Sequence, residues 1–386
     1  MAEMERVPVG ELRDLIVVGE PLPFRVLDGA ARLLLNEGQV VGSQRQFEML
    51  IERMAWVERA LVETARQARV GATGATAPAA QHGTTLFDLW EKTVWDLDEL
   101  TRRLVRGEAR AAEVEGFAVR LLALMDRDID VALFLCARQD DKRFALYALT
   151  HGLHCAVLGS LVARQLGWTS ERLLCLAQAA LTMNLAIHEL QAVLAEQREP
   201  PGKRQLEQLR AHPDASAELL RKAGVVDADW LAAVQDHHER ADGGGYPRGT
   251  QEVSDMAALL RATDVFMAKI SPRAARAPMV PQLATRQLFQ SEGGAAVATA
   301  LIRAVGLYPP GSLVQLRSGE VAVVTRRPSN GSAPLVATLS NRQGVPVVDT
   351  QRRDTAEPEF AVQSPLADAS AFGRVLPERV YGLIYA

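Results

Sequence analysis

The chain has 386 residues, of which 48% are hydrophobic and 23% charged, and its net charge is −4. This length is enough for two or three domains with sizeable cores, and the slight excess of acid argues against a protein that binds nucleic acid through bulk positive charge. The charged N-terminus has no apolar signal core, and we find no apolar run of the roughly 18 residues that a membrane span needs. We therefore predict a cytoplasmic protein that binds neither nucleic acid nor membrane.

Residues 1–70 are predicted to form a small α+β domain. Residues 21–41 alternate short apolar runs with turn signals, which is typical of small strands. Residues 43–67 then carry apolar side chains at helical spacing, with Ser43 as a candidate N-cap. Residues 71–83, GATGATAPAAQHG, are rich in Gly, Ala and Thr and predict a flexible linker.

Residues 84–305 are helical in pattern throughout. Residues 151–167 carry apolar side chains every four positions, and residues 171–190 are apolar nearly all round, which is typical of a central helix. A further helix is predicted to start at Pro213, since proline suits the first helical position, and another is predicted to be capped by Ser254. The region therefore predicts an all-helical bundle.

The pattern changes beyond residue 305, and residues 306–386 are predicted to form a small β unit with a tail. Residues 311–350 are rich in Val and Leu, alternate, and are punctuated by Ser-Gly and Gln-Gly, which indicates antiparallel strands. The tail from residue 351 is predicted to be irregular. The whole chain is thus predicted to be mainly α, a helical bundle flanked by a small α+β unit and a small β unit.

Three of the seven histidines, His212, His237 and His238, fall close together in the helical region. Imidazole suits Zn, Fe and Mn, and a carboxylate commonly completes such sites. Adjacent histidines on a regular element point in different directions, so His237 and His238 are able to serve two metals, or a metal and a substrate. The spacing alone leaves open the alternative that the pair caps a helix C-terminus.

Asp264 is an acid in an otherwise apolar helical stretch. A buried carboxylate needs a partner, which would be a metal ion or an ordinary ion pair with Arg261 or Arg273. The chain's three cysteines form no CxxC pair and lie in apolar surroundings, so we predict buried thiols without a metal or disulfide role.

The run DGGGYP, from Asp242 to Pro247, predicts a glycine turn followed by an aromatic side chain at a fixed angle. Such a turn is either a plain connector or a place where backbone N–H groups approach a phosphate while Tyr246 stacks. Arg248, Arg273 and Arg276 lie near it in the sequence and suit a phosphorylated ligand.

The stretch HHERADGGGYPRG resembles the signature of the HD-GYP family, metal-dependent phosphodiesterases of cyclic di-GMP built on the helical HD-domain scaffold. HGLHCA, HPDASAELL and ATDVFMAKISPRAAR resemble other motifs of that family, so the likeness runs in order over about residues 130–305. The metal ligands that the resemblance implies are His151, His212, His237, His238 and Asp264. The residues that we expect to contact a bound nucleotide are Gly245, Tyr246, Pro247, Arg273 and Arg276.

The chain departs from the family at the His-Asp pair itself and at the lysine that follows. These positions hold Met183, Asn184 and Ile187, while Tyr147 and Met267 replace two further acids. Two divalent ions about 3.5–4 Å apart repel strongly unless a bridging anion offsets the repulsion. Asn184 offers only a neutral oxygen and Met183 only a soft thioether, so no catalytic residue is assigned.

We therefore expect at most one divalent transition-metal ion, Fe, Mn or Zn, held by His212, His237 and His238. His188, one turn after Asn184, is either a substitute ligand or a solvated side chain. The favoured function is a catalytically impaired regulator of cyclic di-GMP signalling that binds a nucleotide or a protein partner, such as a diguanylate cyclase domain. The alternatives are an active phosphodiesterase with altered ligands and a purely structural interaction module.

Overall fold

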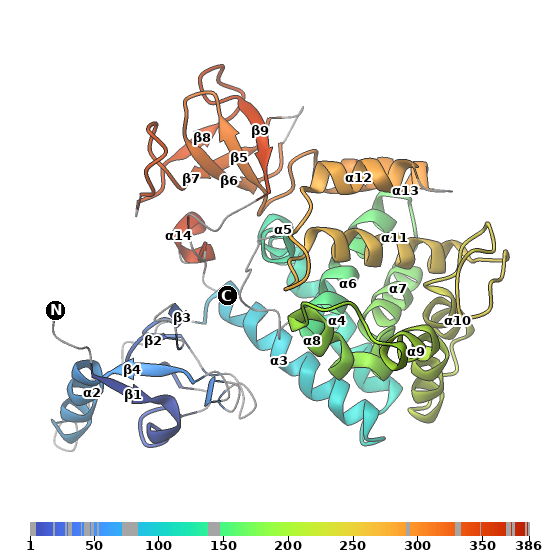
Figure 1. Cartoon of the computed structure of the whole chain (residues 1–386), viewed down its shortest axis with the longest axis horizontal. Helices are drawn as coiled ribbons and strands as arrows, with labels where there is room; N and C mark the ends of the chain where they lie inside the picture. The colour runs from blue at the N-terminus through green and yellow to red at the C-terminus, as the bar shows by residue number, and fades with distance from the viewer. Residues whose placement is uncertain are drawn as a thin grey trace. The chain divides into compact units, whose positions relative to one another are not determined.

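The computed structural model is mainly helical, with two small antiparallel sheets near the two ends of the chain (Figure 1), which confirms the predicted fold class. It describes residues 5–71 with gaps at 18–19, 28, 30–32, 40, 42–46, 48–49 and 52–53, then 84–137, 147–290, 294–328, 333–347, 349–367, 372, 375–382 and 384. The chain divides into two compact units, Met1–Asp96 with Leu383–Ala386, and Leu97–Gly382.

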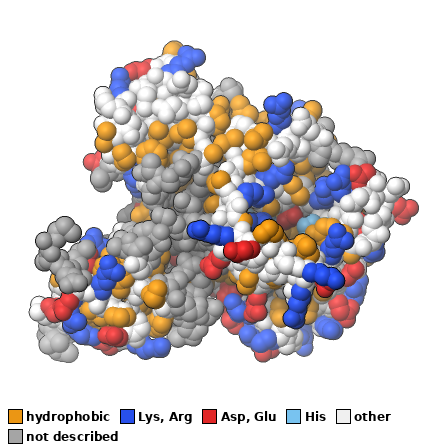
Figure 2. All heavy atoms as spheres, viewed as in Figure 1, with side chains coloured by type: hydrophobic (Ala, Val, Ile, Leu, Met, Phe, Trp, Pro, Cys, Tyr) orange, Lys and Arg blue, Asp and Glu red, His pale blue; other side chains and the backbone are white. Residues whose placement is uncertain are grey.

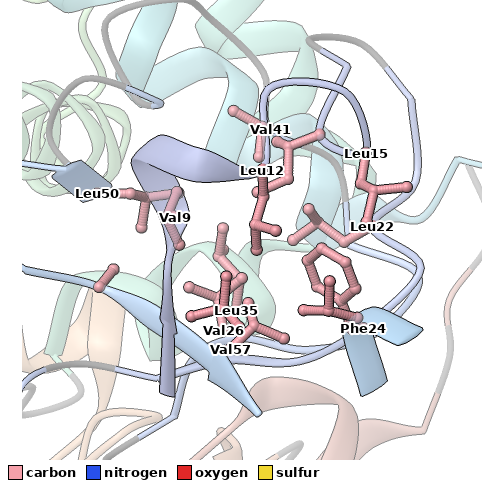
Figure 3. Close-up of a cluster of buried hydrophobic side chains, with 14 of the residues drawn as sticks. Val9, Leu12, Leu15, Leu22, Phe24, Val26, Leu35, Val41, Leu50 and Val57 are labelled. Atoms are coloured by element: carbon pink, nitrogen blue, oxygen red, sulfur yellow. The ribbon is translucent and has the colours of Figure 1, made fainter. Parts of the chain in front are cut away.

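The first unit contains a four-stranded sheet in the order β1-β4-β2-β3. Its elements are β1 (Arg6–Pro8), η1 (Val9–Glu11), β2 (Val26–Leu27), β3 (Leu33–Leu35), β4 (Trp56–Glu58) and α2 (Arg59–Gly71). Phe24, Leu12 and Val57 meet in its hydrophobic core (Figure 3).

The helix predicted over residues 43–67 is wrong in its middle. Trp56 and Val57 are buried, and β4 pairs antiparallel with β1, so the apolar residues there serve a strand. Phe47, Leu50 and Ile51 before it are helical, and α2 begins after it at Arg59. Hydrogen bonding of β4 to β1 decides the structure of these residues, although their apolar spacing also fits a helix; tertiary contacts often outweigh local preference in this way. Ser43 and nearly all of the predicted linker, residues 72–83, lie outside the described residues.

The second unit begins within α3 and is built mostly of helices packed around α6. Its helices are α3 (Leu86–Val105), α4 (Ala111–Arg127), α5 (Ile129–Ala137), α6 (Tyr147–Gln165), α7 (Ser170–Thr182), α8 (His188–Glu196), α9 (Lys203–Lys222), α10 (Ala228–Asp236), α11 (Asp255–Ile270), α12 (Pro281–Gln290), α13 (Gly294–Val305) and α14 (Pro377–Tyr381), with a 3₁₀ turn η3 at Leu185–Ile187.

The helices α6 and α11 confirm the sequence predictions for those segments. α6 packs against α7, α11 and α13, with an almost entirely buried surface. α11 is capped by Ser254, whose side chain accepts a hydrogen bond from the backbone N–H of Ala257. The predicted central helix over residues 171–190 is instead interrupted, because α7 ends at Thr182 and η3 and α8 follow.

The prediction that a helix starts at Pro213 is wrong, because α9 begins ten residues earlier and carries Pro213 inside it. A proline inside a helix removes the N–H that would bond to the carbonyl four residues before, here the carbonyl of Leu209. The imidazole of His212 contacts that carbonyl instead, with Nδ1 2.6 Å from the oxygen. The helix therefore continues through the proline, and the histidine ring is anchored.

The C-terminal sheet has the order β8-β7-β6-β5-β9 and is antiparallel throughout, as predicted. Its strands are β5 (Leu313–Leu316), β6 (Val321–Arg326), β7 (Leu335–Thr338), β8 (Arg352–Asp354) and β9 (Val362–Leu366). The irregular tail predicted from residue 351 is therefore wrong, since β8, β9 and α14 lie within it. Ion pairs from Arg326 to Asp128 and from Arg327 to Asp130 join β6 and the residue after it to the start of α5.

One stretch among the described residues, Ser170–Glu196, is long and apolar enough by composition to cross a membrane, with 67% of its most apolar window buried inside the protein. The sequence pattern had indicated no such run. Core helices pass the same test, and this stretch is the interrupted α7–η3–α8 segment. The three cysteines are all buried thiols, as predicted.

Candidate metal and nucleotide site

Three histidines from two parts of the helical unit meet at one point. His212 lies in the middle of α9, while His237 and His238 directly follow α10, which ends at Asp236. One ring nitrogen from each can be chosen such that all three lie within 4.8 Å of one another. The expectation that the adjacent histidines diverge is wrong, because they follow the last turn of α10 and do not sit on a regular element.

The hydrogen bonds of two of these rings fix which nitrogen carries the proton. His212 Nδ1 lies 2.6 Å from the Leu209 carbonyl, and His237 Nδ1 lies 2.6 Å from the Val234 carbonyl. A carbonyl only accepts hydrogen bonds, so Nδ1 donates in both rings and each neutral ring presents a bare lone pair at Nε2. Both carbonyls lack the usual N–H four residues later, one because of Pro213 and one because α10 ends.

The two bare nitrogens face each other, with His212 Nε2 3.1 Å from His237 Nε2, and both side chains are almost fully buried. Two lone pairs at this separation repel unless a cation lies between them. Neighbouring ligands of one ion at about 2.0–2.1 Å are roughly 2.9–3.4 Å apart, so the spacing fits a transition metal such as zinc. The outward Nδ1 bonds supply the second shell that orients such ligands.

The local environment keeps these imidazoles neutral. Burial, and next the neighbouring His237, lower the pKa of His212 to about 3. Burial also lowers the pKa of His237, and burial together with His237 lowers the pKa of His238 well below its ordinary value. Neutral imidazole is the form that binds a metal, so protons do not compete with an ion near neutral pH.

The other two predicted ligands, His151 and Asp264, form a second group with Cys155. His151 Nε2 lies 2.7 Å from Asp264 Oδ1, and Cys155 Sγ lies 3.7 Å from the same nitrogen. Burial alone would raise the pKa of the Asp264 carboxyl, but the hydrogen bond and charge of His151 hold it well below its usual range. Asp264 therefore pairs with a histidine and not with Arg261 or Arg273, the partners considered from the sequence.

The glycine turn is shaped by a close approach of the backbone. A Cβ on Gly245 would lie 2.5 Å from Glu239 Cα and from Arg240 N, so only glycine fits there. The Glu239 carboxylate is buried beneath the turn and accepts hydrogen bonds from the backbone N–H groups of Arg248 and Gly249. Tyr246, which follows Gly245, stacks on His238 with ring centroids 4.6 Å apart. The peptide bond between Tyr246 and Pro247 is cis.

Gly245→Ala is expected to lower the free energy of unfolding by about 1–3 kcal/mol, since the new methyl group overlaps backbone atoms that cannot move independently. Urea unfolding of the metal-free protein measures this. Gly116→Ala is the matched control, because its Cβ would meet only the end of the Arg120 side chain and alanine favours the helix by roughly 0.5–1 kcal/mol. Equal stability of Gly245→Ala and the parent would contradict the close approach.

The two arginines expected to contact a phosphate are engaged with the protein. Arg273 hydrogen-bonds to the Tyr147 hydroxyl and lies over its ring, 4.5 Å from the centroid, and Tyr147 in turn stacks on His151. Arg276 is exposed and hydrogen-bonds to the Ala268 carbonyl. Arg273 thus positions the ring that covers His151, a role that the sequence did not suggest.

The two positions at which the resemblance implies a His-Asp pair follow the end of α7. Met183 is fully buried, while Asn184 is half-buried and lines a small pocket with Gly152 and His188. His188 is neither a ligand of the histidine group nor a solvated side chain, because its Nε2 lies 3.2 Å from the buried carboxylate of Asp98. Asp98 belongs to α3, far away in the sequence, so no local pattern could have indicated the pair.

Figure 2 shows histidine atoms reaching the surface on the viewed face, with Lys and Arg side chains nearby. At the three-histidine group, Tyr246 stacks on His238, and Arg210 and Arg261 interact electrostatically with the Tyr246 phenol. Basic side chains beside an aromatic ring suit an anionic ligand that carries a flat ring. Sequence reasoning missed Cys155, Asp98 and Glu239. Cys155 follows His151 by one helical turn, a spacing that could have indicated a shared face.

Part of the helical unit is similar to known proteins. Residues 141–294 match the family described as HD domain. Cyclic di-GMP phosphodiesterase PA4108 of Pseudomonas aeruginosa is 35% identical over 120 residues, which are 30% of this chain and 29% of the relative. Among solved structures, Bd1817, an HDG"Y"P protein from Bdellovibrio bacteriovorus, covers 77% of this chain and 97% of its own, with 13% identity and a TM-score of 0.49.

The aligned part of the curated relative is thus less than a third of that protein's length. The matched family lies over the helices that carry both donor groups and the glycine turn. This chain therefore contains an HD domain with distant similarity to the HD-GYP cyclic di-GMP phosphodiesterases.

Proposed function

We propose that this protein is a catalytically impaired member of the HD-GYP group, which binds a metal ion at its three histidines and a cyclic dinucleotide beside them. The observation that carries the proposal is the pair of facing Nε2 atoms of His212 and His237, 3.1 Å apart and buried. Such a pair is favourable only with a cation between the nitrogens. The similarity to a cyclic di-GMP phosphodiesterase supports the choice of nucleotide.

Impairment follows from the missing anion and the missing imidazole at Asn184 and Met183. A bound divalent ion activates water and neutralises phosphate charge. The three histidines contribute no negative charge, and Met183 is a buried thioether at the place where the resemblance implies a ligand imidazole. In this proposal the protein keeps residues that hold and orient an ion and a nucleotide, while the Met183 and Asn184 positions supply neither an imidazole nor a carboxylate.

The nucleotide is proposed to stack on Tyr246 and to place its phosphates near Arg210 and Arg261. Tyr246 is partly exposed and already stacks on His238, so its ring is held in one orientation. Both arginines interact electrostatically with the Tyr246 phenol. Arg276 remains a further phosphate candidate because it is exposed, although it hydrogen-bonds to the protein.

The exposed turn around Asp242 and Gly244 also supports a protein partner, for which a diguanylate cyclase domain is the proposed candidate. A regulator of this kind reports the bound nucleotide to its partner without destroying it. Binding without turnover is therefore the property to test first.

Calorimetry with cyclic di-GMP on the metal-loaded chain is expected to show binding, while product analysis shows little or no hydrolysis. Replacing Arg210 and Arg261 together with alanine is expected to weaken binding at least tenfold, since each charge-assisted contact is worth about 1.5–3 kcal/mol. The matched control replaces Arg286 and Arg303, which are exposed on α12 and α13. No binding by the parent protein, or equal affinity of the Arg210/Arg261 variant, would contradict the proposal.

A further inference from the structure

The second donor group combines three different ligand types in a buried position. His151 and Cys155 lie one turn apart on α6, and Asp264 faces them from α11. One atom from each residue lies within 4.8 Å of the others. The exposed fractions are 2% for His151, 0% for Cys155 and 9% for Asp264.

We propose that His151, Cys155 and Asp264 bind a second divalent ion, and that the thiolate of Cys155 makes this site select zinc over iron and manganese. The inference goes beyond the proposed function, because it concerns other ligands and a different ion and does not depend on nucleotide binding. It replaces the expected single ion with two, and it replaces the expected inert thiol with a ligand.

The distances fit such an ion with little rearrangement. Tetrahedral zinc with ligands at about 2.0–2.3 Å places neighbouring donor atoms roughly 3.3–3.8 Å apart. The separation of 3.7 Å between Cys155 Sγ and His151 Nε2 falls in this range. The separation of 2.7 Å between His151 Nε2 and Asp264 Oδ1 is that of a hydrogen bond, so a proton now occupies the place of the ion. An ion would displace that proton and widen the contact by under about 1 Å.

Binding of the ion displaces one proton from Cys155 and moves another within the His151 ring. The thiol proton of Cys155 leaves to solvent as the sulfur binds, which is the usual proton release of a metal–cysteine site. The imidazole proton of His151 moves from Nε2 to Nδ1, which makes no hydrogen bond among the described residues. No oxidation or reduction is involved.

The second donor group contains side chains that can carry negative charge, which the three-histidine group lacks. A thiolate and a carboxylate together balance a divalent ion, whereas three neutral imidazoles leave its charge uncompensated. Asp264 interacts electrostatically with His237 and His238, so the two groups are neighbours. Negative charge between two neighbouring ions lowers their repulsion. Cys155 therefore supplies, from α6, an anion that the Asn184 position no longer offers.

The choice of zinc follows from the softness of the sulfur. Thiolate and imidazole ligands suit zinc, whereas magnesium, calcium and manganese prefer oxygen ligands. Cobalt(II) binds the same ligands and reports a bound thiolate through a charge-transfer absorption band in the near ultraviolet. Cobalt and zinc are therefore the two probes for the full-length, metal-free chain.

Titration with cobalt(II) is expected to produce the thiolate band, and zinc is expected to displace it with about two zinc ions bound per chain in total. Cys155→Ala should lose the band and one of the two ions, with zinc affinity at that site weakened by at least the roughly 10–100-fold that losing an outer-shell partner costs. Cys175→Ala is the control, because it removes another buried thiol, which lies beside Met256 and Asp227.

His237→Ala separates this inference from the proposed function. It disables the three-histidine group, so it should bind one ion fewer while keeping the thiolate band. A parent protein that binds cobalt without the band would overturn the second site and leave the three-histidine site standing. Retention of the band in a folded Cys155→Ala variant would overturn it as well, and the parent spectrum decides the question even where that variant does not fold.

Discussion

The double variant Met183→His/Asn184→Asp is expected to hydrolyse cyclic di-GMP on the order of 10³-fold faster than the parent protein. The substitutions place an imidazole and a carboxylate at the end of α7, at the two positions where the resemblance implies metal ligands. A well-held metal ion stabilises the charge of the transition state by several kcal/mol. Each ~1.4 kcal/mol removed from the activation free energy raises the rate tenfold. Product formation in the presence of manganese, iron or zinc measures the effect. Adding Ile187→Lys should raise turnover further by placing a cation near the phosphate.

Two comparisons make that result interpretable. Asn184→Asp alone supplies the charge without the imidazole, so it should gain much less. Met183 is fully buried, so an imidazole there must find a partner, and urea unfolding of each variant shows whether the helical unit tolerates it. Strong metal-dependent turnover by the parent protein, abolished in His237→Ala, would show that the site is complete without the His-Asp pair.

The metal-free protein is expected to lose several kcal/mol of its free energy of unfolding between pH 6.5 and pH 4. Burial lowers the pKa of His212 to about 3, and the pKa values of His237 and His238 are also lowered. The unfolded chain takes up protons on these histidines below about pH 6.5, while the folded chain takes them up only at lower pH. Because the unfolded state binds more protons in this window, stability falls with pH, by about 1.4 kcal/mol per pH unit for each such histidine.

The Asp264 carboxyl, whose pKa is also strongly shifted, titrates in a different pH window. The pKa of Asp264 is depressed in the folded protein, so its contribution is complete above its unfolded pKa near 4 and is lost only at lower pH. Urea unfolding at several pH values with a chelator present therefore isolates the histidines. His212→Asn should flatten the dependence by about one proton, since an amide N–H can still donate to the Leu209 carbonyl. An unchanged dependence in that variant would contradict the burial argument.

Contacts between residues that are far apart in the sequence explain most of what the sequence did not predict. The periodicity of α6, the cap of α11 and the alternation in the C-terminal sheet are local signals, and the structure confirms those elements. The strand β4 was mistaken for helix because its apolar residues also fit helical spacing, and only pairing with β1 decides between the two. The start of α9 was misplaced because proline at a helix start and proline inside a helix look alike in one sequence.

In the candidate site, the identity of the donor residues was predicted from the sequence, but their grouping was not. His151, Asp264 and the three clustered histidines were all predicted as ligands, yet their grouping into two separate sets depends on how α6, α9, α10 and α11 pack. The partnership of His188 with Asp98 joins residues from α8 and α3 that no spacing rule connects. Cys155 was set aside as an inert thiol because its neighbours in the sequence are apolar. Its chemical neighbours come from elsewhere on the fold.

The proline inside α9 has a consequence for how this helix can change. A more regular helix, with an N–H at position 213, would satisfy the Leu209 carbonyl through its own backbone and would be more stable in isolation. The Nδ1 of His212 would then lose its acceptor, and the ring could turn or change tautomer. The missing backbone N–H at Pro213 thus orients the Nε2 lone pair of His212, and a substitution there that stabilises the helix would release the ring.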